Sequence, residues 1–157
     1  MARLLRHLAA VLLLPGTVCV LVPAGLVGDA ELAPSPLPLL GAVLLAAGLA
    51  VIGWTVSLFA RVGRGTLAPW DPTSALVVRG PYRHVRNPMI SGVIAVLLGE
   101  AALVGSLALL AWAAIVFAVN AVYFPLVEEP GLRRRFGPAY DEYAARTPRW
   151  VPRLRPG

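Results

Sequence analysis

The chain has 157 residues, of which 58% are apolar, and its mean hydropathy is +0.74, whereas a soluble domain of this size is about 45–50% apolar. All 14 basic residues are arginines and they outnumber the eight acids, so the formal net charge is +6. Such a charge can indicate nucleic-acid binding, but the apolar residues are grouped in blocks of about 20, the length that crosses ~30 Å of hydrocarbon. The composition therefore argues against a soluble protein and against nucleic acid as a partner, and it predicts one all-α membrane domain over residues 1–157.

Four apolar blocks predict four transmembrane helices, at about residues 4–26, 37–60, 88–104 and 107–127. The first block has a basic start, as a signal peptide does, but its apolar stretch is long for one, so we expect a retained helix. In the second block Ala42, Ala46 and Ala50 recur at spacings of four. This row of small residues predicts a face that another helix approaches closely.

The arginines are distributed unevenly between the predicted loops. The loop at 28–37 contains none, and its charged residues are Asp29 and Glu31. By the positive-inside rule, the 61–87 loop, the 128–157 tail and both termini are expected in the cytoplasm. The sequence thus predicts a multi-pass protein of the cell membrane.

The 61–87 loop is too long for a simple connector, and loops of this length are often functional. Its Gly63-Arg64-Gly65-Thr66 run cannot hold a stable helix, and its prolines favour extended or turn geometry. Pro88 suits the first turn of the third helix. Gly105-Ser106 is expected to turn the chain between the third and fourth helices.

Two polar residues interrupt the apolar hairpin formed by the third and fourth helices, Glu100 and Asn120. Ionisable groups within a membrane normally face a bundle interior or a cavity. Glu100 either does so or reaches out to the outer interface, and the sequence leaves both alternatives open. For Asn120 we expect a hydrogen bond to another helix.

The tail is predicted to be amphipathic rather than membrane-spanning. Pro138 can begin a short helix, and Phe136, Tyr140 and Tyr143 recur at spacings that place them on one helical face. Arg133-Arg134-Arg135 is expected to meet anionic lipid at the interface.

Charged residues lie at both ends of the hairpin, on the predicted cytoplasmic side. Residues 79–92 read Arg-Gly-Pro-Tyr-Arg-His-Val-Arg-Asn-Pro-Met-Ile-Ser-Gly, and the fourth helix ends in Glu128-Glu129-Pro130. Arginines facing a paired carboxylate suit a small ligand that carries both charges. The alternative is that the arginines only set the topology and the glutamates form an interfacial salt bridge. His7 and His84 are the only histidines and lie far apart in sequence, so no metal site is predicted.

These motifs resemble the isoprenylcysteine carboxyl methyltransferase and phospholipid methyltransferase superfamily of membrane enzymes. The matching positions, in the same order and spacing over about residues 61–153, are Gly80, Tyr82, Arg83, Arg86, Pro88, Gly92, Glu128-Glu129, Leu132, Phe136-Gly137, Tyr140, Tyr143 and Val151-Pro152. The resemblance implies a methyltransferase that uses S-adenosylmethionine and acts at the cytoplasmic membrane face on a lipid or another apolar acceptor from the bilayer.

The resemblance also implies the site residues. Those expected to contact the cofactor are Leu76, Val77, Tyr82, Arg83, Asn87, Pro88, Met89, Ile90 and Glu128. The candidate catalytic residues are Arg86 and Glu129, and Glu129 is the nearest base if the acceptor is an amine.

This sequence departs from the family pattern at three places. Asn87 replaces a histidine and Ile90 replaces a tyrosine, so neither position can supply a general base. Tyr123-Phe124-Pro125 lacks the arginine that contacts the substrate carboxylate in prenylcysteine relatives, which disfavours such a substrate. Two alternatives remain open: an NADPH-dependent membrane reductase of the sterol reductase type, which shares a similar Arg-His-Pro turn, and a non-catalytic membrane protein.

Overall fold

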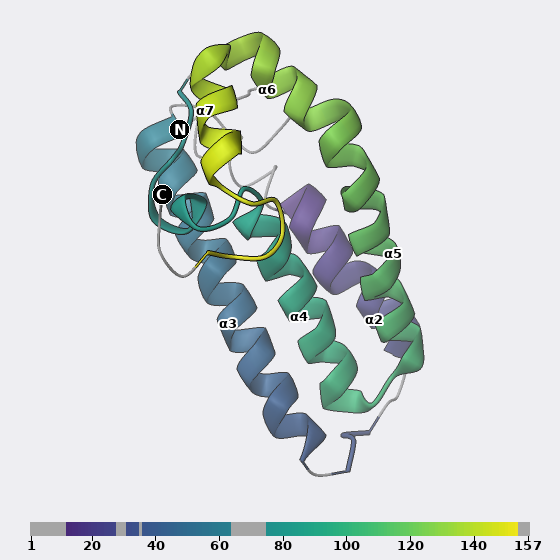
Figure 1. The fold of residues 1–157 in the computed structure, drawn as a ribbon. Helices are drawn as coiled ribbons and strands as arrows, with labels where there is room; N and C mark the ends of the chain where they lie inside the picture. The colour runs from purple at the N-terminus through teal and green to yellow at the C-terminus, as the bar shows by residue number, and fades with distance from the viewer. Residues whose placement is uncertain (1–11, 28–30, 35, 64–74, 154–157) are drawn as a thin grey trace.

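The computed structural model describes residues 12–27, 31–34, 36–63 and 75–153. This part of the chain is helical and contains no strand, as the composition predicts (Figure 1). The start of the predicted first helix and residues 64–74 of the predicted cytoplasmic loop lie outside the described residues.

The long helices form the bundle (Figure 1). Short helical segments lie at one of its ends, and the short helix of residues 22–27 lies near the other end. In chain order the helices are the π-helix η1 (Leu12–Leu21), α2 (Val22–Val27), α3 (Leu37–Leu58), the π-turn η2 (Phe59–Gly63), the 3-10 turn η3 (Gly80–Arg83), α4 (Pro88–Val104), α5 (Leu107–Tyr123), the π-turn η4 (Phe124–Glu128), α6 (Glu129–Phe136) and α7 (Pro138–Arg146).

Two helices of the described chain are long and apolar enough to cross a membrane. They are Leu37–Leu58 and the continuous helix Leu107–Phe136, which contains α5, η4 and α6. Both expose most of their apolar side chains, as a lipid-facing surface requires. The apolar segments Gly16–Val27 and Pro88–Val104 are shorter; the 17 residues of α4 span about 25 Å at a rise of ~1.5 Å per residue. The count of four spans remains a prediction.

The helix boundaries around α4 match the sequence prediction. Pro88 occupies the first turn of α4, where its missing N–H costs no hydrogen bond. The helix ends at Gly105, whose φ of 63° is a left-handed conformation that glycine adopts without strain. Ser106 then begins the next helix, because its side chain accepts a hydrogen bond from the Leu109 amide at 3.3 Å.

Glycines bring α3 and α4 into direct backbone contact, and the two helices lie side by side (Figure 1). A Cβ built on Gly48 would lie 2.6 Å from the Gly92 carbonyl oxygen. Seven residues earlier, a Cβ built on Gly41 would lie 2.7 Å from the Gly99 carbonyl oxygen. The helices therefore approach so closely that not even a methyl group fits between them at these two levels.

The prediction that Ala42, Ala46 and Ala50 form the contact face is wrong, because all three are exposed. These alanines do share one face of α3, but that face is not the one that packs against α4. The physical reason is the distance between the helices, which is too short for a Cβ and therefore selects glycine rather than alanine.

A buried cluster fills the space between α4 and its other neighbours. It consists of Cys19 from η1, Val93, Val96 and Leu97 from α4, and Ala113 and Val116 from α5. Trp112 of α5 donates its indole N–H to the Val18 carbonyl oxygen at 3.0 Å. This bond connects α5 to η1, and it satisfies a carbonyl in the irregular helix around Pro15.

The two polar residues of the hairpin behave differently. Asn120 donates to the Val116 carbonyl oxygen of its own helix at 2.8 Å, so the expected bond to another helix is wrong. A short amide side chain reaches the carbonyl four residues earlier without a partner helix. Glu100 is half-buried, and one of its carboxylate oxygens is enclosed without a hydrogen-bond partner among the described residues. Its side chain thus turns toward the bundle, the first of the two alternatives.

The predicted end of the fourth helix, near Val127, is wrong, because the helix continues to Phe136. Pro125 and Pro130 lack amide hydrogens and interrupt regular α-helical bonding twice. The chain responds with the wider turn η4, in which the Glu129 amide reaches back to the Phe124 carbonyl oxygen. Gly137, with a φ of 54°, then ends the helix, and Pro138 begins α7 as predicted.

Candidate functional site

The predicted site residues come from segments that meet at one end of the bundle. There α3 ends, α4 begins, and α5 continues into α6 and α7, which fold back over this end (Figure 1). The other end is closed by the turn between α4 and α5. Residues from the two ends of the hairpin sequence are therefore close in space, as the sequence predicts.

Tyr82 is the buried centre of this end, with an exposed fraction of 8%. Gly80 has a φ of 57°, which lets the chain turn sharply into η3 and places Tyr82 against Phe59, at 5.6 Å between ring centroids. Tyr143 of α7 donates its hydroxyl to the Tyr82 carbonyl oxygen at 2.8 Å. Burial, then the neighbouring Tyr143 and the charge of Glu128, raise the pKa of the Tyr82 phenol. The phenol is therefore neutral at physiological pH and cannot act as a base.

Two arginines from different segments converge on Glu129. Arg86 donates from Nη1 to Oε1 at 3.0 Å, and Arg149 donates from Nε to Oε1 at 2.6 Å and from Nη2 to Oε2 at 3.0 Å. The exposed fraction of the Glu129 side chain is only 7%. A carboxylate so enclosed needs such charge-assisted bonds to remain ionised. Both of its oxygens are thus occupied in this structure.

Arg149 was not among the residues predicted from the sequence. It is one of seven arginines between residues 133 and 155, and nothing in its spacing distinguishes it from the others. Its contact with Glu129 depends on how α7 and the following residues fold back, which the local sequence does not encode.

Glu128 differs from its neighbour. Its carboxylate makes no hydrogen bond to another described residue, but it lies close enough to Arg135 to interact with the guanidinium charge and close enough to Tyr82 to influence the phenol. The turn η4 ends at this residue, so Glu128 and Glu129 are directed to different surroundings. Glu129 is therefore committed to contacts within the protein, whereas no hydrogen bond holds Glu128 within the described residues.

The residues after α7 run back along the segment that precedes α4, and we call residues 147–153 the C-terminal strap. Four hydrogen bonds join the strap to this segment: Arg86 N to Pro148 O at 2.8 Å, Arg153 N to His84 O at 3.0 Å, His84 Nδ1 to Arg153 O at 2.7 Å, and Asn87 Nδ2 to Arg149 O at 3.4 Å. Asn87, at the family's histidine position, therefore contacts the strap through its amide.

The remaining predicted residues vary in burial. Val77 and Pro88 are buried, Leu76, Met89 and Ile90 are half-buried, and Arg83 is exposed. Arg86 Nε is buried and finds no acceptor among the described residues. Nη1 of Arg86 therefore donates a hydrogen bond to Glu129, whereas its Nε has no hydrogen-bond acceptor among the described residues. The described residues contain no group of three side chains suited to a metal ion.

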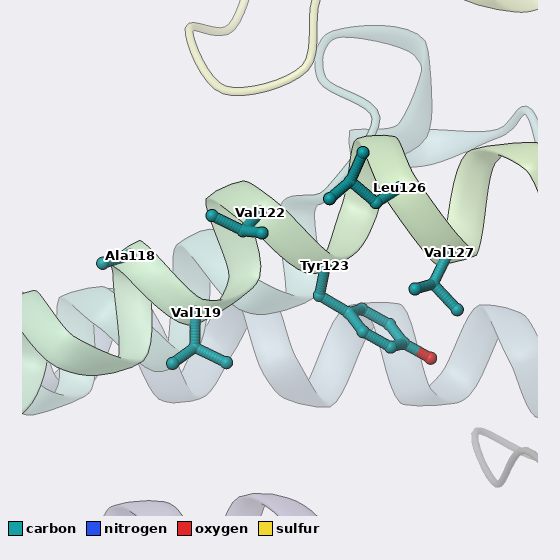
Figure 2. A pocket seen from close by; sticks show the side chains of 6 residues that line it. All are labelled: Ala118, Val119, Val122, Tyr123, Leu126 and Val127. Atoms are coloured by element: carbon teal, nitrogen blue, oxygen red, sulfur yellow. The ribbon is translucent and has the colours of Figure 1, made fainter.

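A shallow, open apolar surface, called the groove below, lies on the exposed side of the helix formed by α5 and η4 (Figure 2). Its volume is about 570 Å³, and its lining residues are Ala118, Val119, Val122, Tyr123, Leu126 and Val127. The phenolic oxygen of Tyr123 is the polar group shown at this surface. The groove ends at Val127, adjacent in sequence to Glu128.

Comparison with known proteins agrees with the geometry. The profile of the phospholipid methyltransferase family matches residues 37–139, which include α3, the described part of the loop, the hairpin and the glutamate pair. The chain is also 32% identical over 118 residues to the nickel-cobalt-cadmium resistance protein NccN of Alcaligenes xylosoxydans xylosoxydans, covering 73% of this chain and 53% of that protein. The chain thus spans about half the length of this relative. No solved structure matches it. On the family match, which covers well over half of its residues, this chain belongs to the phospholipid methyltransferase family.

Proposed function

We propose that the protein is an S-adenosylmethionine-dependent methyltransferase that acts on a lipid or another apolar acceptor at the cytoplasmic membrane face. Family membership supports methyl transfer in a membrane. The observation that carries the proposal is the contrast between the glutamates. Glu129 is bonded by two arginines through both oxygens, whereas Glu128 makes no hydrogen bond among the described residues and lies near Tyr82 and the charge of Arg135.

The residues at this end of the bundle fit the cofactor's chemistry. Glu128 suits its ammonium group, and the unengaged Nε of Arg86 suits its carboxylate. Buried Val77 and Pro88, with half-buried Leu76, Met89 and Ile90, offer apolar surface for an adenine. When bound, S-adenosylmethionine supplies an electrophilic methyl group on a sulfonium ion. Exposed Arg83 has no described contact with the rest of the site, so its proposed role rests on the family pattern alone.

The pairing of Glu129 changes its proposed role. A carboxylate held by two arginines is a weak base, because taking up a proton would leave both cations without their partner. We infer that Glu129 orients Arg86, and that the site acts by positioning the reactants in surroundings of low polarity. An acceptor that needs no strong base suits such a site.

We further propose that the acceptor reaches the site from the bilayer along the groove of Figure 2. The groove is apolar, and its helix is long and exposed enough to face lipid. Its last lining residue, Val127, directly precedes Glu128. A hydrocarbon chain gains about 0.8 kcal/mol for each methylene that it buries. The groove carries no arginine, which is consistent with an acceptor that is not bound through a carboxylate.

Calorimetric titration of the protein in lipid nanodiscs with S-adenosylhomocysteine and, separately, with NADPH tests the proposal. Binding of S-adenosylhomocysteine alone, abolished or weakened in Glu128→Gln, supports the methyltransferase. Binding of NADPH alone would favour a reductase, and binding of neither would favour a non-catalytic membrane protein. Extraction of lipids after incubation with isotopically labelled methyl donor then identifies the acceptor.

A further inference from the structure

The C-terminal strap forms hydrogen bonds with two parts of the candidate site, residues 84–87 and Glu129. It bonds to the backbone on both sides of Val85, through the Arg86 amide and the His84 carbonyl oxygen. Because these bonds join main-chain groups, they fix the path of the segment that leads into α4. The strap thereby determines where the side chains of this segment point.

The strap is also attached to α5. Trp150 packs on Phe117 at 5.1 Å and on Phe124 at 5.7 Å between ring centroids. Arg149, one residue earlier, bonds Glu129 just beyond η4. The strap therefore connects the start of α4 to the end of α5, the two places that carry the proposed ligand-binding residues.

Arg149 is the residue at which these connections meet. Its carbonyl oxygen accepts from Asn87, while its guanidinium holds both oxygens of Glu129. The side chain of Arg149 is 32% exposed and that of Glu129 is 7% exposed, so the guanidinium covers a carboxylate that water barely reaches. Without Arg149, this carboxylate would keep Arg86 as its hydrogen-bonded cation, with the charge of Arg133 also nearby, and it would be free to rotate toward them.

We propose that Arg149 is a positioning residue for the cofactor site: it fixes the orientation of Glu129, and through it the guanidinium of Arg86 and the rotation of the helix at Glu128. This inference rests on the proposed function. A planar fork that bonds both oxygens sets an angle as well as a distance, whereas a lysine ammonium sets only a distance. A positive charge at position 149 is therefore necessary to hold Glu129 in place, but a lysine would not fix the orientation of the carboxylate as an arginine does.

The test compares Arg149→Gln and Arg149→Lys with Arg146→Gln in nanodiscs. Arg146 is an exposed arginine of the same region whose side chain pairs only with the exposed Glu142 among the described residues. We expect Arg149→Gln to weaken S-adenosylhomocysteine binding about ten- to a hundredfold, as loss of charge-assisted bonds does, and Arg149→Lys to recover part of it. Arg146→Gln should bind within about twofold of the native chain. Equal affinity for all four proteins would overturn the proposal.

A second control separates positioning from general destabilisation. Gly41→Ala should destabilise the bundle at the level of Gly99, far along α4 from Pro88, without touching the strap. At a temperature where both variants are folded, Gly41→Ala should keep native affinity. In kinetic assays Arg149→Gln should raise KM for S-adenosylmethionine and lower kcat, and unchanged values of both would contradict the inference.

Hydrogen exchange distinguishes failure of this inference from failure of the proposed function. Arg149→Gln should lose protection of the amides in residues 82–87, and Arg146→Gln should not. This comparison needs no ligand, so it tests the strap even if the native protein binds no S-adenosylhomocysteine, a result that would refute the proposed function alone. Native protection of residues 82–87 in Arg149→Gln would refute the positioning role.

Discussion

Replacing Gly48 by alanine tests whether backbone contact between α3 and α4 holds the bundle together. The new Cβ would lie 2.6 Å from the Gly92 carbonyl oxygen and 2.8 Å from the Val96 amide nitrogen. Ordinary contact begins near 3.4 Å, and both neighbours are backbone atoms of a helix, so the helices must separate by several tenths of an ångström. Overpacking of this kind costs about 1–3 kcal/mol.

The matched control is Gly53→Ala, five residues along the same helix. A Cβ at Gly53 meets nothing within 4 Å, so this variant shows the effect of glycine to alanine on helix stability alone, up to about 1 kcal/mol in favour of alanine. Because that contribution is common to both variants, their difference isolates the packing cost. We expect Gly48→Ala to be about 1–3 kcal/mol less stable than Gly53→Ala.

Thermal unfolding in one detergent, followed by circular dichroism, measures the difference. For a chain of this size, 1 kcal/mol corresponds to roughly 2–4 °C in Tm. If the two variants unfold at the same temperature, the close approach of the helices does not stabilise the bundle, and the reasoning from the glycine contacts fails.

Four further outcomes are expected. Glu128→Gln should weaken S-adenosylhomocysteine binding by roughly 1.5–3 kcal/mol, about ten- to a hundredfold by calorimetry, and unchanged affinity would mean that the carboxylate serves the fold only. Reporter fusions at Ala33 should report the side opposite the cytoplasm, and a cytoplasmic signal would reverse the topology. Val122→Trp fills part of the groove and should raise KM for the acceptor while leaving S-adenosylhomocysteine affinity unchanged; a normal KM would exclude the groove as the acceptor's path. On addition of S-adenosylhomocysteine, hydrogen exchange should slow across residues 75–87 and 128–143 together, and slowing in one segment alone would contradict a ligand that bridges them.

Local signals in the sequence were sufficient for the helix ends that depend on single residues. Pro88 begins α4 and Gly105 ends it, because proline restricts φ and glycine tolerates positive φ wherever they occur. The grouping of Tyr82 and Glu128 at one end of the bundle was also predictable, since a hairpin of two similar helices must return the chain to the side from which it started.

Features that depend on distances between helices were not predictable from patterns. Alanine and glycine rows both suit close packing, and which row faces α4 depends on the interhelical distance. Asn120 bonded within its own helix because a local acceptor was available. Arg149 reaches Glu129 only after α7 and the strap have folded back, and the sequence separation of 20 residues carries no signal for that contact.

The π-turn η4 makes the effect of a deletion depend on where in the helix it falls. A π-turn holds more residues than an α-turn, so a one-residue deletion within Phe124–Glu128 would convert it toward regular helix, and the residues beyond it would keep nearly the same direction. A one-residue deletion in the regular helix α5 has no extra residue to absorb it, so every later residue would rotate by about 100° and shift by ~1.5 Å along the axis. Glu129 would then turn away from Arg86 and Arg149, although no side chain of the site had been altered. Deletions in α5 should therefore abolish function far more readily than a deletion within η4.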